Sequence, residues 1–517
     1  FGTRESLIQQ FNIDVRAVQP ILFTMLEHMH TGLQGPSHSM LMIPTFTDVP
    51  SKPVNGLYLA LDFGGTNFRC LLLNIKHNEI LDSWSDSRKI DPQIPTSKEL
   101  MSVLGGFIQD FLHLHEKELT PRPDILYTGY TFSFPTEQTS LNSGTLVHWT
   151  KEFITKGCVG EDPVKQLQEE LNKRNLDWVK IIAMCNDTVG TLCTRRLTDP
   201  SVEIGVILGT GSNASYREKI SNIKKLDPKA IYSSDHMLIN MEWGSFSGMP
   251  QNEFDKIIFE KTKEHSSQPF EKQISGRYLP MMAREALRKA ILTGCVFNGL
   301  WGDGSTLSDE EKSPFSDIHR EMWDEKHRLR GEEMEEIIWD ESEKKEKVEE
   351  ILRQLWCKSN PRLKLREGVT LQLSDLSLVQ QLFKAILTRS ARLSAIAVSA
   401  VVIHIVKGFI EEAKEKGRSE TDYLAKHPKI TAAIDGSLFT HNRGYKEEMA
   451  RSVELCLDSV KGYCLTSSSS SSSSATPSSS TETSVSFSFP SIIPEVVLEA
   501  TNDGSGIGAA VIVAANS

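Results

Sequence analysis

The sequence predicts a mixed α/β fold made of two similar domains. Apolar strand-like runs alternate with helical periodicity through most of the 517 residues. Residues 59–73 and 204–218 share one pattern: an apolar strand, a Gly- and Thr-rich turn that ends in Asn, and a second strand. Two related hairpins in one chain indicate two domains that are built alike and face each other. The length fits roughly two to four domains.

Individual elements follow from local patterns. Strands are predicted at 125–134, 179–185 and 203–209, and helices at 98–119 and 162–174. The second helix has a clear start, because Asp162 is a favourable N-cap and Pro163 fits the first helical turn.

The longest apolar run, residues 393–406, is predicted to be a buried core helix. It is short for a bilayer span and contains Ser394, Ser399 and His404. The sequence therefore predicts no membrane span.

Two polar stretches are predicted to lie on the surface. In the charge run at 340–350, the charges form the solvated face of a helix whose apolar face continues through Ile351, Leu352 and Leu355. Eight consecutive serines, 467–474, lie in a Ser/Thr-rich stretch that reaches about residue 488. Such a tract buries too little apolar surface to offset its ordering entropy, so a disordered loop is expected there.

The charge and cysteine content narrow the class of protein. With 57 basic and 68 acidic residues the net charge is −11, which argues against nucleic acid or an anionic membrane as a partner. The eight cysteines show no CxxC spacing, which favours reduced thiols in a cytoplasmic setting.

The turn at Gly64 and Gly65 has two interpretations. A tight hairpin needs only glycine there. Backbone N–H groups of such a turn also form a nest for phosphate oxygens, and Thr66, Asn67 and Arg69 would add donors.

Two more glycine-rich turns lie at 208–213 and at 503–508. The dinucleotide fingerprint fails at the second of these, because the chain stops at Ser517 before the required acidic residue. The sequence also has no Walker-type GK[ST] motif, so a bound nucleotide would be held between hairpins.

Three acidic residues are candidates for chemistry. Asp187 ends an apolar strand, where a carboxylate can accept a hydroxyl proton during phosphoryl transfer. Taken alone, it is better explained as a helix N-cap. Glu242 and Glu271 lie in apolar, aromatic stretches, where they are either satisfied locally or kept for a polyhydroxylated ligand.

Ten stretches in the chain together resemble the eukaryotic-type hexokinase family. In family order they are LALDFGGTNFR, TFSFPTEQ, LVHWTKEF, CNDTVGTL, GVILGTGSNASY, NMEWGSF, FEKQISGRY, LTRSARLSA, AIDGSLF and NDGSGIGAA. They span roughly residues 35–517.

The resemblance implies an actin-like ATPase fold: two ribonuclease-H-like domains with the active site in the cleft between them. The small domain would be 54–187, completed by a C-terminal helix at 503–517. The large domain would be 188–502, with a disordered Ser-rich loop at 466–489 and the N-terminal segment 1–53 packed on it. The charged region at about 305–372 is longer than the family requires and is expected to lie away from the motifs.

The resemblance also implies roles for particular residues. Asp187 would be the base for the 6-hydroxyl of a hexose, with Lys151 as a second catalytic residue. The sugar pocket would comprise Ser133, Phe134, Thr150, Lys151, Asn186, Asp187, Asn213, Glu242 and Glu271. ATP would meet Asp62, Gly64, Gly65, Thr66, Asn67, Arg69, Thr210, Gly211, Gly436 and Ser437. Mg²⁺ would be held mainly by ATP phosphates and water, not by a protein cage.

Three functions are weighed: an ATP-dependent hexose kinase acting on glucose and related hexoses, an actin- or chaperone-type ATPase, and a catalytically weak sugar sensor. The sugar-pocket set favours the kinase over the ATPase. The presence of the base and the phosphate donors favours it over the sensor. The chain is expected to be cytoplasmic, as a monomer or a homodimer.

Overall fold

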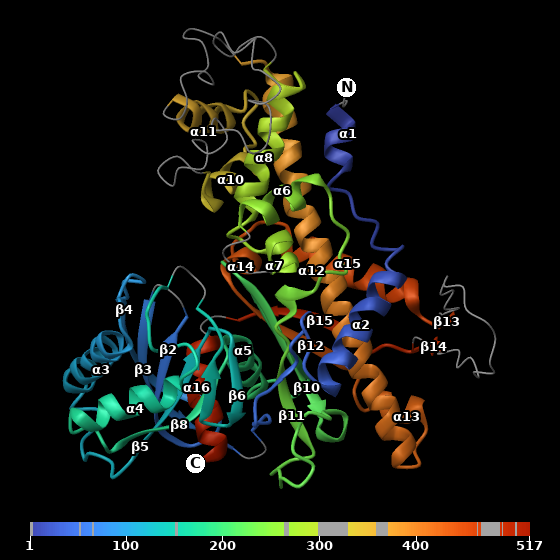
Figure 1. Ribbon diagram of the computed structural model, residues 1–517. Helices are drawn as coiled ribbons and strands as arrows, with labels where there is room; N and C mark the ends of the chain where they lie inside the picture. Colours follow the sequence, from blue (N-terminus) through green and yellow to red (C-terminus); the bar gives the residue numbers. More distant parts are fainter. Residues whose placement is uncertain are drawn as a thin grey trace, which may run out of the picture.

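Two β-sheets form the framework of the protein, each with its own helices (Figure 1). The computed structural model describes residues 4–50, 53–64, 67–149, 153–262, 268–297, 329–357, 371–462, 464–466, 486–488, 490–501 and 504–517.

The five-stranded sheet has the order β4-β3-β2-β5-β8. Strands β2, β3 and β4 are antiparallel neighbours, while β5 and β8 continue the sheet parallel to β2. Helices α3 and α4 pack on one face, and α16 packs on the other. The elements are β2 (Gly56–Phe63), β3 (Asn67–Lys76), β4 (Glu79–Lys89), α3 (Ser97–Leu114), β5 (Leu126–Phe132), β6 (Thr136–Ser140), β7 (Ser143–Leu146), α4 (Pro163–Lys173), β8 (Val179–Cys185) and α16 (Gly504–Asn516).

The six-stranded sheet has the order β1-β11-β10-β9-β12-β15. Strands β9, β10 and β11 are antiparallel neighbours, and β12 and β15 run parallel to β9. The strands are β1 (Ile43–Pro44), β9 (Val202–Leu208), β10 (Ser212–Lys219), β11 (His236–Asn240), β12 (Lys429–Asp435) and β15 (Glu495–Ala500). The remaining elements around this sheet are α1 (Arg4–Gln9), α2 (Gln19–Gln34), α5 (Asp187–Arg196), η1 (Ile220–Asn222), η2 (Trp243–Ser245), α6 (Glu253–Lys261), α7 (Pro269–Ile274), α8 (Leu279–Leu292), α10 (Gly331–Ile338), α11 (Glu346–Cys357), α12 (Leu373–Glu415), α13 (Glu420–Leu424), α14 (Ser437–Thr440), α15 (Tyr445–Val460), β13 (Cys464–Thr466) and β14 (Ser486–Ser488).

The two sheets repeat one arrangement, in which three antiparallel strands are followed by two parallel ones. Strands β2, β3, β4, β5 and β8 correspond in order to β9, β10, β11, β12 and β15. The two related hairpins predicted from the sequence are therefore β2–β3 and β9–β10, and the prediction of two similarly built units is confirmed. The chain boundaries given above for the two domains stay a prediction.

Helices α5 and α16 lie between the two sheets and pack closely on each other (Figure 1). A Cβ atom at Gly508 of α16 would overlap the backbone of Gly190 of α5, so these helices meet backbone to backbone. Helix α5 also rests on β9, where a side chain at Gly205 would overlap the carbonyl of Thr188. Glycine permits this approach because it has no Cβ atom. The start of α5 is therefore fixed relative to both sheets.

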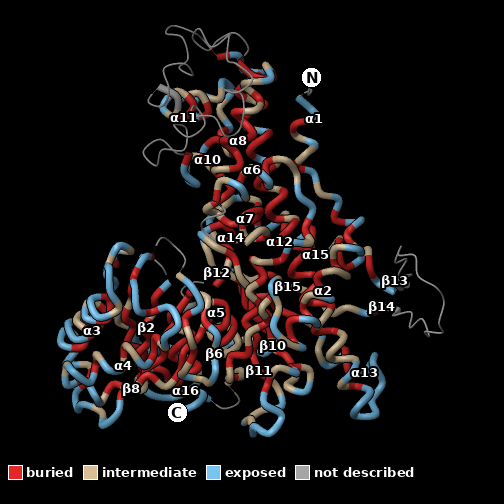
Figure 2. Tube along the Cα trace, viewed as in Figure 1, coloured by how far each residue is buried: buried red, intermediate tan, exposed pale blue. Residues whose placement is uncertain are grey.

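Helix α12 is the core of the larger part, as predicted for 393–406. It is long and apolar enough to cross a membrane by length and composition, but 72% of its most apolar window is buried inside the protein. Figure 2 shows the middle part of this helix as buried, with α15 beside it. Apolar residues of α1 and α2 join the same core, including Leu7, Leu22 and Met29.

The structure differs from the predicted elements in two places. The helix predicted at 98–119 ends at Leu114, and His115 caps it. The loop predicted at 466–489 is bounded by a short antiparallel strand pair, in which Thr466 lies opposite Ser486. Most of the serine tract, 467–485, lies outside the described residues.

The apolar face predicted after the charge run at 340–350 is confirmed. In α11 the side chains of Val348, Ile351 and Leu352 are buried, and Leu355 packs against the same core.

Candidate active site

The carboxyl ends of three parallel strands in the smaller sheet lie in one row. Asp62 at the end of β2 is in register with Thr131 of β5, which is in register with Cys185 of β8. Open α/β sheets bind ligands at this edge. Asp187 follows the same row two residues beyond Cys185, so two carboxylates lie along one sheet edge.

Cys185 lies between these two carboxylates as a neutral thiol. Burial raises the pKa of its thiol to about 12; the hydrogen bond with Thr131 opposes this, and the negative charges of Asp62 and Asp187 add to it. The Thr131 hydroxyl lies 3.6 Å from the Cys185 sulfur. Cys185 therefore adds no charge to the site.

Asp187 begins helix α5 but does not cap it. Asn186 is the N-cap: it has extended backbone angles, and its side-chain oxygen accepts hydrogen bonds from the Thr188 N–H at 3.0 Å and the Thr188 hydroxyl at 2.9 Å. The interpretation of Asp187 as the cap is wrong by one residue, because the adjacent asparagine fills that role. Asp187 is instead the first helical residue, and its carboxylate accepts from the Thr188 N–H at 3.0 Å.

Four polar side chains from both sheets form one cluster beside Asp187. The Asn213 amide nitrogen lies 2.7 Å from the Asn240 side-chain oxygen, 3.2 Å from a Glu242 carboxylate oxygen and 3.4 Å from the Asn186 side-chain oxygen. The Asn240 amide nitrogen also donates to Glu242 at 2.9 Å. These four residues, Asn186, Asn213, Asn240 and Glu242, are called the amide cluster below. They present amide and carboxylate groups suited to hydroxyl groups of a ligand.

Glu242 has a backbone conformation that is unusual for its type. Its φ of 53° and ψ of 47° lie in the left-handed region, which costs a non-glycine residue about 1–2 kcal/mol. Such strain concentrates at functional sites. Its carboxylate accepts two hydrogen bonds within the amide cluster.

Glu271 holds the tip of the β9–β10 hairpin. It lies on α7, and its carboxylate accepts the Ser212 backbone N–H at 2.9 Å. A side chain at Gly211 would meet this carboxylate at 2.7 Å. Glu271 is thus satisfied locally and at the same time brought close to the tip that carries Thr210 and Gly211.

The tip of the β2–β3 hairpin carries a charged pair. Asp62 and Arg69 lie directly opposite each other across the hairpin, and a guanidinium nitrogen is 3.2 Å from the carboxylate. A Cβ at Gly506 of α16 would lie 2.5 Å from the Arg69 guanidinium, so the bare backbone of α16 makes room for it. Asn67 is exposed at the start of β3, and Gly64 follows the end of β2.

Ser133 and Phe134 follow β5 and are buried beside the β2 strand. The Ser133 N–H donates to the Phe63 carbonyl at 3.2 Å. The Phe134 ring lies 5.2 Å from Phe63 and 4.8 Å from Trp149, centroid to centroid, within an aromatic cluster. Four predicted site residues, Gly65, Thr66, Thr150 and Lys151, lie outside the described residues.

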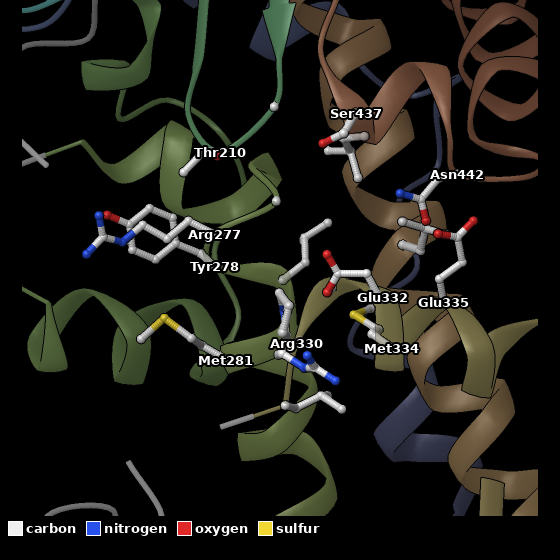
Figure 3. Close-up of a pocket in the computed structure, with 18 of the residues that line it drawn as sticks. Thr210, Arg277, Tyr278, Met281, Arg330, Glu332, Met334, Glu335, Ser437 and Asn442 are labelled. Carbon is white, nitrogen blue, oxygen red and sulfur yellow. The ribbon is translucent and has the colours of Figure 1, made fainter. Parts of the chain in front are cut away.

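A cavity of about 790 Å³ opens beside the β9–β10 tip (Figure 3). Its lining includes Gly209 and Thr210 from that tip, Arg277 and Tyr278 after α7, and Ser437 at the start of α14. Backbone hydrogen bonds join two of these walls: Gly276 donates to the Gly209 carbonyl at 2.8 Å, and Arg277 to the Thr210 carbonyl at 3.3 Å. In Figure 3 the Glu332 carboxylate points into the middle of this space, whereas the Arg277 and Tyr278 side chains extend away from it.

Gly436 joins this cavity to the sheet. Its φ of 125° suits glycine, and a Cβ there would overlap the Leu208 carbonyl. The preceding residue, Asp435, accepts the Gly504 N–H at 3.1 Å and so ties the start of α16 to the end of β12.

Sequence reasoning missed three parts of this region. Asn240 lies two residues before Glu242, but β11 ends at Asn240 and Glu242 has left-handed backbone angles, so no strand period marked the pair. Asp435 directly precedes the predicted Gly436. Helix α10 lies within the charged region expected to be remote from the motifs, yet Glu332 and Glu335 line the same cavity as Thr210 and Ser437. That expectation is wrong, because a long excursion in sequence returns to the site in space.

Within the part of the chain that the structure describes, no group of three or more His, Cys, Asp or Glu side chains is arranged to hold a metal ion. The six cysteines whose side chains are described, Cys70, Cys158, Cys185, Cys193, Cys295 and Cys456, are buried and form no disulfide.

Comparison with known proteins gives one consistent family. Two family models described as hexokinase match residues 3–197 and 203–515. Hexokinase-1 of Spinacia oleracea is 32% identical over 502 residues, covering 95% of this chain and 86% of the relative. Hexokinase-1 of Saccharomyces cerevisiae is 30% identical over 519 residues, covering 98% of this chain and 90% of the relative.

The fold agrees with this family. A solved hexokinase from Schistosoma mansoni, complexed with glucose, has a TM-score of 0.70 and 24% identity, over 99% of this chain and 98% of that one. This likeness shows the actin-like ATPase fold that the sequence resemblance implies. The chain belongs to the hexokinase family and is an enzyme of that family.

Proposed function

We propose that the protein transfers the γ-phosphoryl group of ATP to the 6-hydroxyl of glucose and related hexoses, including mannose and fructose. The observation that carries this proposal is the amide cluster beside Asp187, drawn from both sheets. A polyhydroxylated ligand needs many fixed acceptors and donors, and this cluster supplies them next to a carboxylate at a helix start.

The hexose is bound by the amide cluster together with Asp187, Glu271, Ser133 and Phe134. Thr150 and Lys151 complete this set on the strength of the family motif. The glucose complex of the Schistosoma mansoni hexokinase supports this choice of ligand. Since the groups come from both sheets, sugar binding draws the two halves together, excludes water and orients the 6-hydroxyl.

Asp187 is the general base. Its carboxylate accepts the proton of the 6-hydroxyl as that oxygen attacks the γ-phosphorus. The Thr188 N–H, which donates to it at 3.0 Å, orients the carboxylate at the start of α5. Lys151 is proposed as a second catalytic residue that stabilises charge on the transferred group.

ATP is held by both hairpin tips. Asp62, Gly64, Asn67 and Arg69 meet the phosphates with Gly65 and Thr66, while Thr210, Gly211, Gly436 and Ser437 surround the opposite side and the nucleoside. The cavity of about 790 Å³ lies within the range of ligand pockets, about 300–1,000 Å³.

Mg²⁺ fits this donor set. Asp62 offers hard carboxylate oxygens, and the neighbouring Gly64 has no side chain, so phosphate and water can approach. Bound Mg²⁺ supplies charge neutralisation on the phosphates. Asp62 would hold the Mg²⁺ of the nucleotide, and Arg69 would add positive charge beside the phosphates.

The cysteines bear on the cellular compartment. The buried, unbridged cysteines support a reducing compartment such as the cytoplasm, where hexose 6-phosphate formation is the first step of glycolysis. The expected assembly is a monomer or a homodimer.

A coupled assay with a panel of hexoses tests the proposal. The purified protein should form sugar 6-phosphate from glucose only when ATP and Mg²⁺ are present. Calorimetry in parallel measures glucose binding without turnover. Glucose binding with no phosphorylation of any hexose would contradict the kinase and favour the catalytically weak sugar sensor. Absence of both binding and turnover would contradict the sugar site itself.

A further inference from the structure

The charged helix α10 contributes an acidic wall to the cavity beside Thr210 and Ser437. In Figure 3 the Glu332 side chain extends from α10 into the central space, and Ser437 lies above it in this view. Glu335, one turn further along, lies beside Asn442 at the edge of the same space. The cavity therefore contains a carboxylate whose role neither the fold nor the proposed mechanism has used.

The charge of Glu332 acts on its neighbour Arg330, but the ion-pair partner of Arg330 is Glu333. The adjacent Arg330 is engaged elsewhere: its guanidinium lies 2.9 Å from Glu333, and the Glu333 carboxylate also accepts the Arg330 backbone N–H at 2.9 Å. Among the described residues, no hydrogen bond or ion pair is recorded for the Glu332 carboxylate. It is an exposed acceptor directed into a ligand-sized cavity.

The charge of Glu332 restricts what can lie against it. A triphosphate carries several negative charges, and like charges repel at short range. Lys261, Arg277, Arg284 and Arg330 also line the cavity, so phosphates can be accommodated elsewhere in it. The Glu332 carboxylate itself is suited to the uncharged end of a nucleotide, where hydrogen-bond donors are available. Two vicinal ribose hydroxyls can both donate to one carboxylate, which is how acidic side chains read the ribose in dinucleotide-binding folds.

We propose that Glu332 binds the ribose hydroxyls of the donor nucleotide and makes the protein select ribonucleoside over deoxyribonucleoside triphosphates. This rests on the proposed function, because it takes the cavity as the nucleoside end of the ATP site. It also gives the charged insertion a part in donor selection. Phosphates are held at the hairpin tips, and α10 reads the sugar of the nucleotide.

The matched control is Glu336 on the same helix. It is exposed, does not line this cavity, and lies one helical turn beyond Glu332, 3.6 Å from Lys347. Glu332→Gln and Glu336→Gln remove the same charge from one short helix. Any general effect of charge on α10 should therefore be equal in the two variants.

Calorimetry with Mg²⁺ and ATP, 2′-deoxy-ATP, 3′-deoxy-ATP or ITP tests the inference without turnover. The unmodified protein and Glu336→Gln should bind ATP at least about tenfold more tightly than either deoxynucleotide, a discrimination of the size expected for a charge-assisted hydrogen bond. Glu332→Gln should reduce that ratio to about two or less, through weaker ATP binding. ITP, which lacks the 6-amino group, should bind like ATP in all three proteins.

Three results would overturn the inference: no preference for ATP in the unmodified protein, an unchanged ratio in Glu332→Gln, or an effect of Glu332→Gln on the ATP/ITP ratio alone, which would assign the carboxylate to the base. Thermal melting of both variants checks their folding, and Glu332→Ala provides a second variant with the same expected loss. The hexose assay separates the two proposals. If the protein phosphorylates glucose and the ratio of ATP to deoxynucleotide affinity is unchanged in Glu332→Gln, only the role of Glu332 is contradicted. If the protein binds ATP with the expected preference over the deoxynucleotides but phosphorylates no hexose, only the proposed kinase activity is contradicted.

Discussion

The two hairpins of the protein share one topology but use it differently. At the β2–β3 tip the chemistry is carried by side chains, since Asp62 faces Arg69 at 3.2 Å across the strands. At the β9–β10 tip it is carried by backbone: Gly209 bonds to Gly211 and Gly276, and Glu271 accepts the Ser212 N–H. The same hairpin topology thus provides charged side chains at the β2–β3 tip and a tightly packed, hydrogen-bonded backbone at the β9–β10 tip. This packed backbone is called the frame below.

This difference predicts how each tip responds to change. The frame around β9 leaves no room for added atoms, so substitutions there should first lower stability. The charged tip of β2 has side chains that can be removed without overlap, so substitutions there should first lower activity. Two experiments test this contrast directly, and two more probe other groups of the larger sheet; they follow in decreasing order of expected effect.

The largest effect is expected from Gly436→Ala. Both its positive φ of 125° and the overlap of a Cβ with the Leu208 carbonyl oppose a side chain. We expect a loss of about 3 kcal/mol or more in the free energy of unfolding. Thermal melting and urea titration measure it. Gly160→Ala is the control, with a φ of 83° but nothing within 4 Å, and should cost about 1 kcal/mol. Equal losses in the two variants would refute the packed frame.

Arg69→Ala should lower kcat/KM for ATP about 30-fold while glucose affinity and melting temperature stay nearly unchanged. The reason is that a charged donor to phosphate is worth roughly 1.5–3 kcal/mol. Steady-state kinetics with ATP as the varied substrate gives the result. Arg88→Ala removes an exposed cation of the same sheet, 3.0 Å from Asp110, and should be neutral. If Arg88→Ala lowers kcat/KM for ATP by a similar factor, the effect comes from the net charge of the protein and not from the position of Arg69 at the hairpin tip.

Glu271→Gln should weaken glucose binding about fivefold, because a neutral acceptor replaces a charged one while the Ser212 N–H keeps a partner. Calorimetry measures the dissociation constant. Glu253→Gln, on the neighbouring α6, provides the comparison. If glucose affinity is retained in Glu271→Gln and ATP affinity falls instead, Glu271 belongs to the nucleotide side.

The smallest effect concerns acid stability of the larger sheet. Burial alone would raise the pKa of Glu218, but the charge of His404 and hydrogen bonds from His404, Asn222 and Tyr216 outweigh it and lower the pKa to about 2 from its ordinary 4.5. Because the folded pKa is depressed, the stabilisation is present above pH 4.5 and is lost as the pH falls toward 2. Between pH 7 and pH 4 this amounts to about 1 kcal/mol.

Melting curves at pH 7 and pH 4 check this. The native protein should lose about 2 °C more than Glu218→Gln over that interval. An equal or larger loss in Glu218→Gln would show that Glu218 does not carry the acid sensitivity.

The sequence was sufficient to predict those features that depend on residues close together in the chain, such as helix starts, buried apolar runs and hairpins. The start of α4 was predicted from Asp162 and Pro163, and Asp162 does accept the Val164 and Lys165 N–H groups. The burial of 393–406 followed from its apolar run, and the two hairpins from their shared pattern. At Asp187 the local signal was ambiguous, because an adjacent asparagine can cap equally well, and Asn186 does so.

Contacts between distant segments were beyond such reasoning. Asn240 meets Asn213 only because β10 and β11 pair, and Asp435 meets Gly504 only because β12 ends beside α16. Likewise, nothing in the composition of α10 indicates that Glu332 lines a cavity with Ser437. These parts of the site are set by tertiary packing, which a linear pattern does not encode.

The most direct test of the account is the turnover of Asp187→Asn with glucose, ATP and Mg²⁺. Asparagine keeps the size of the side chain and its place at the start of α5 but cannot accept the hydroxyl proton. We expect kcat to fall about 10³-fold while the glucose dissociation constant changes by less than about threefold. A folded Asp187→Asn protein with near-native kcat would contradict the assignment of Asp187 as the base.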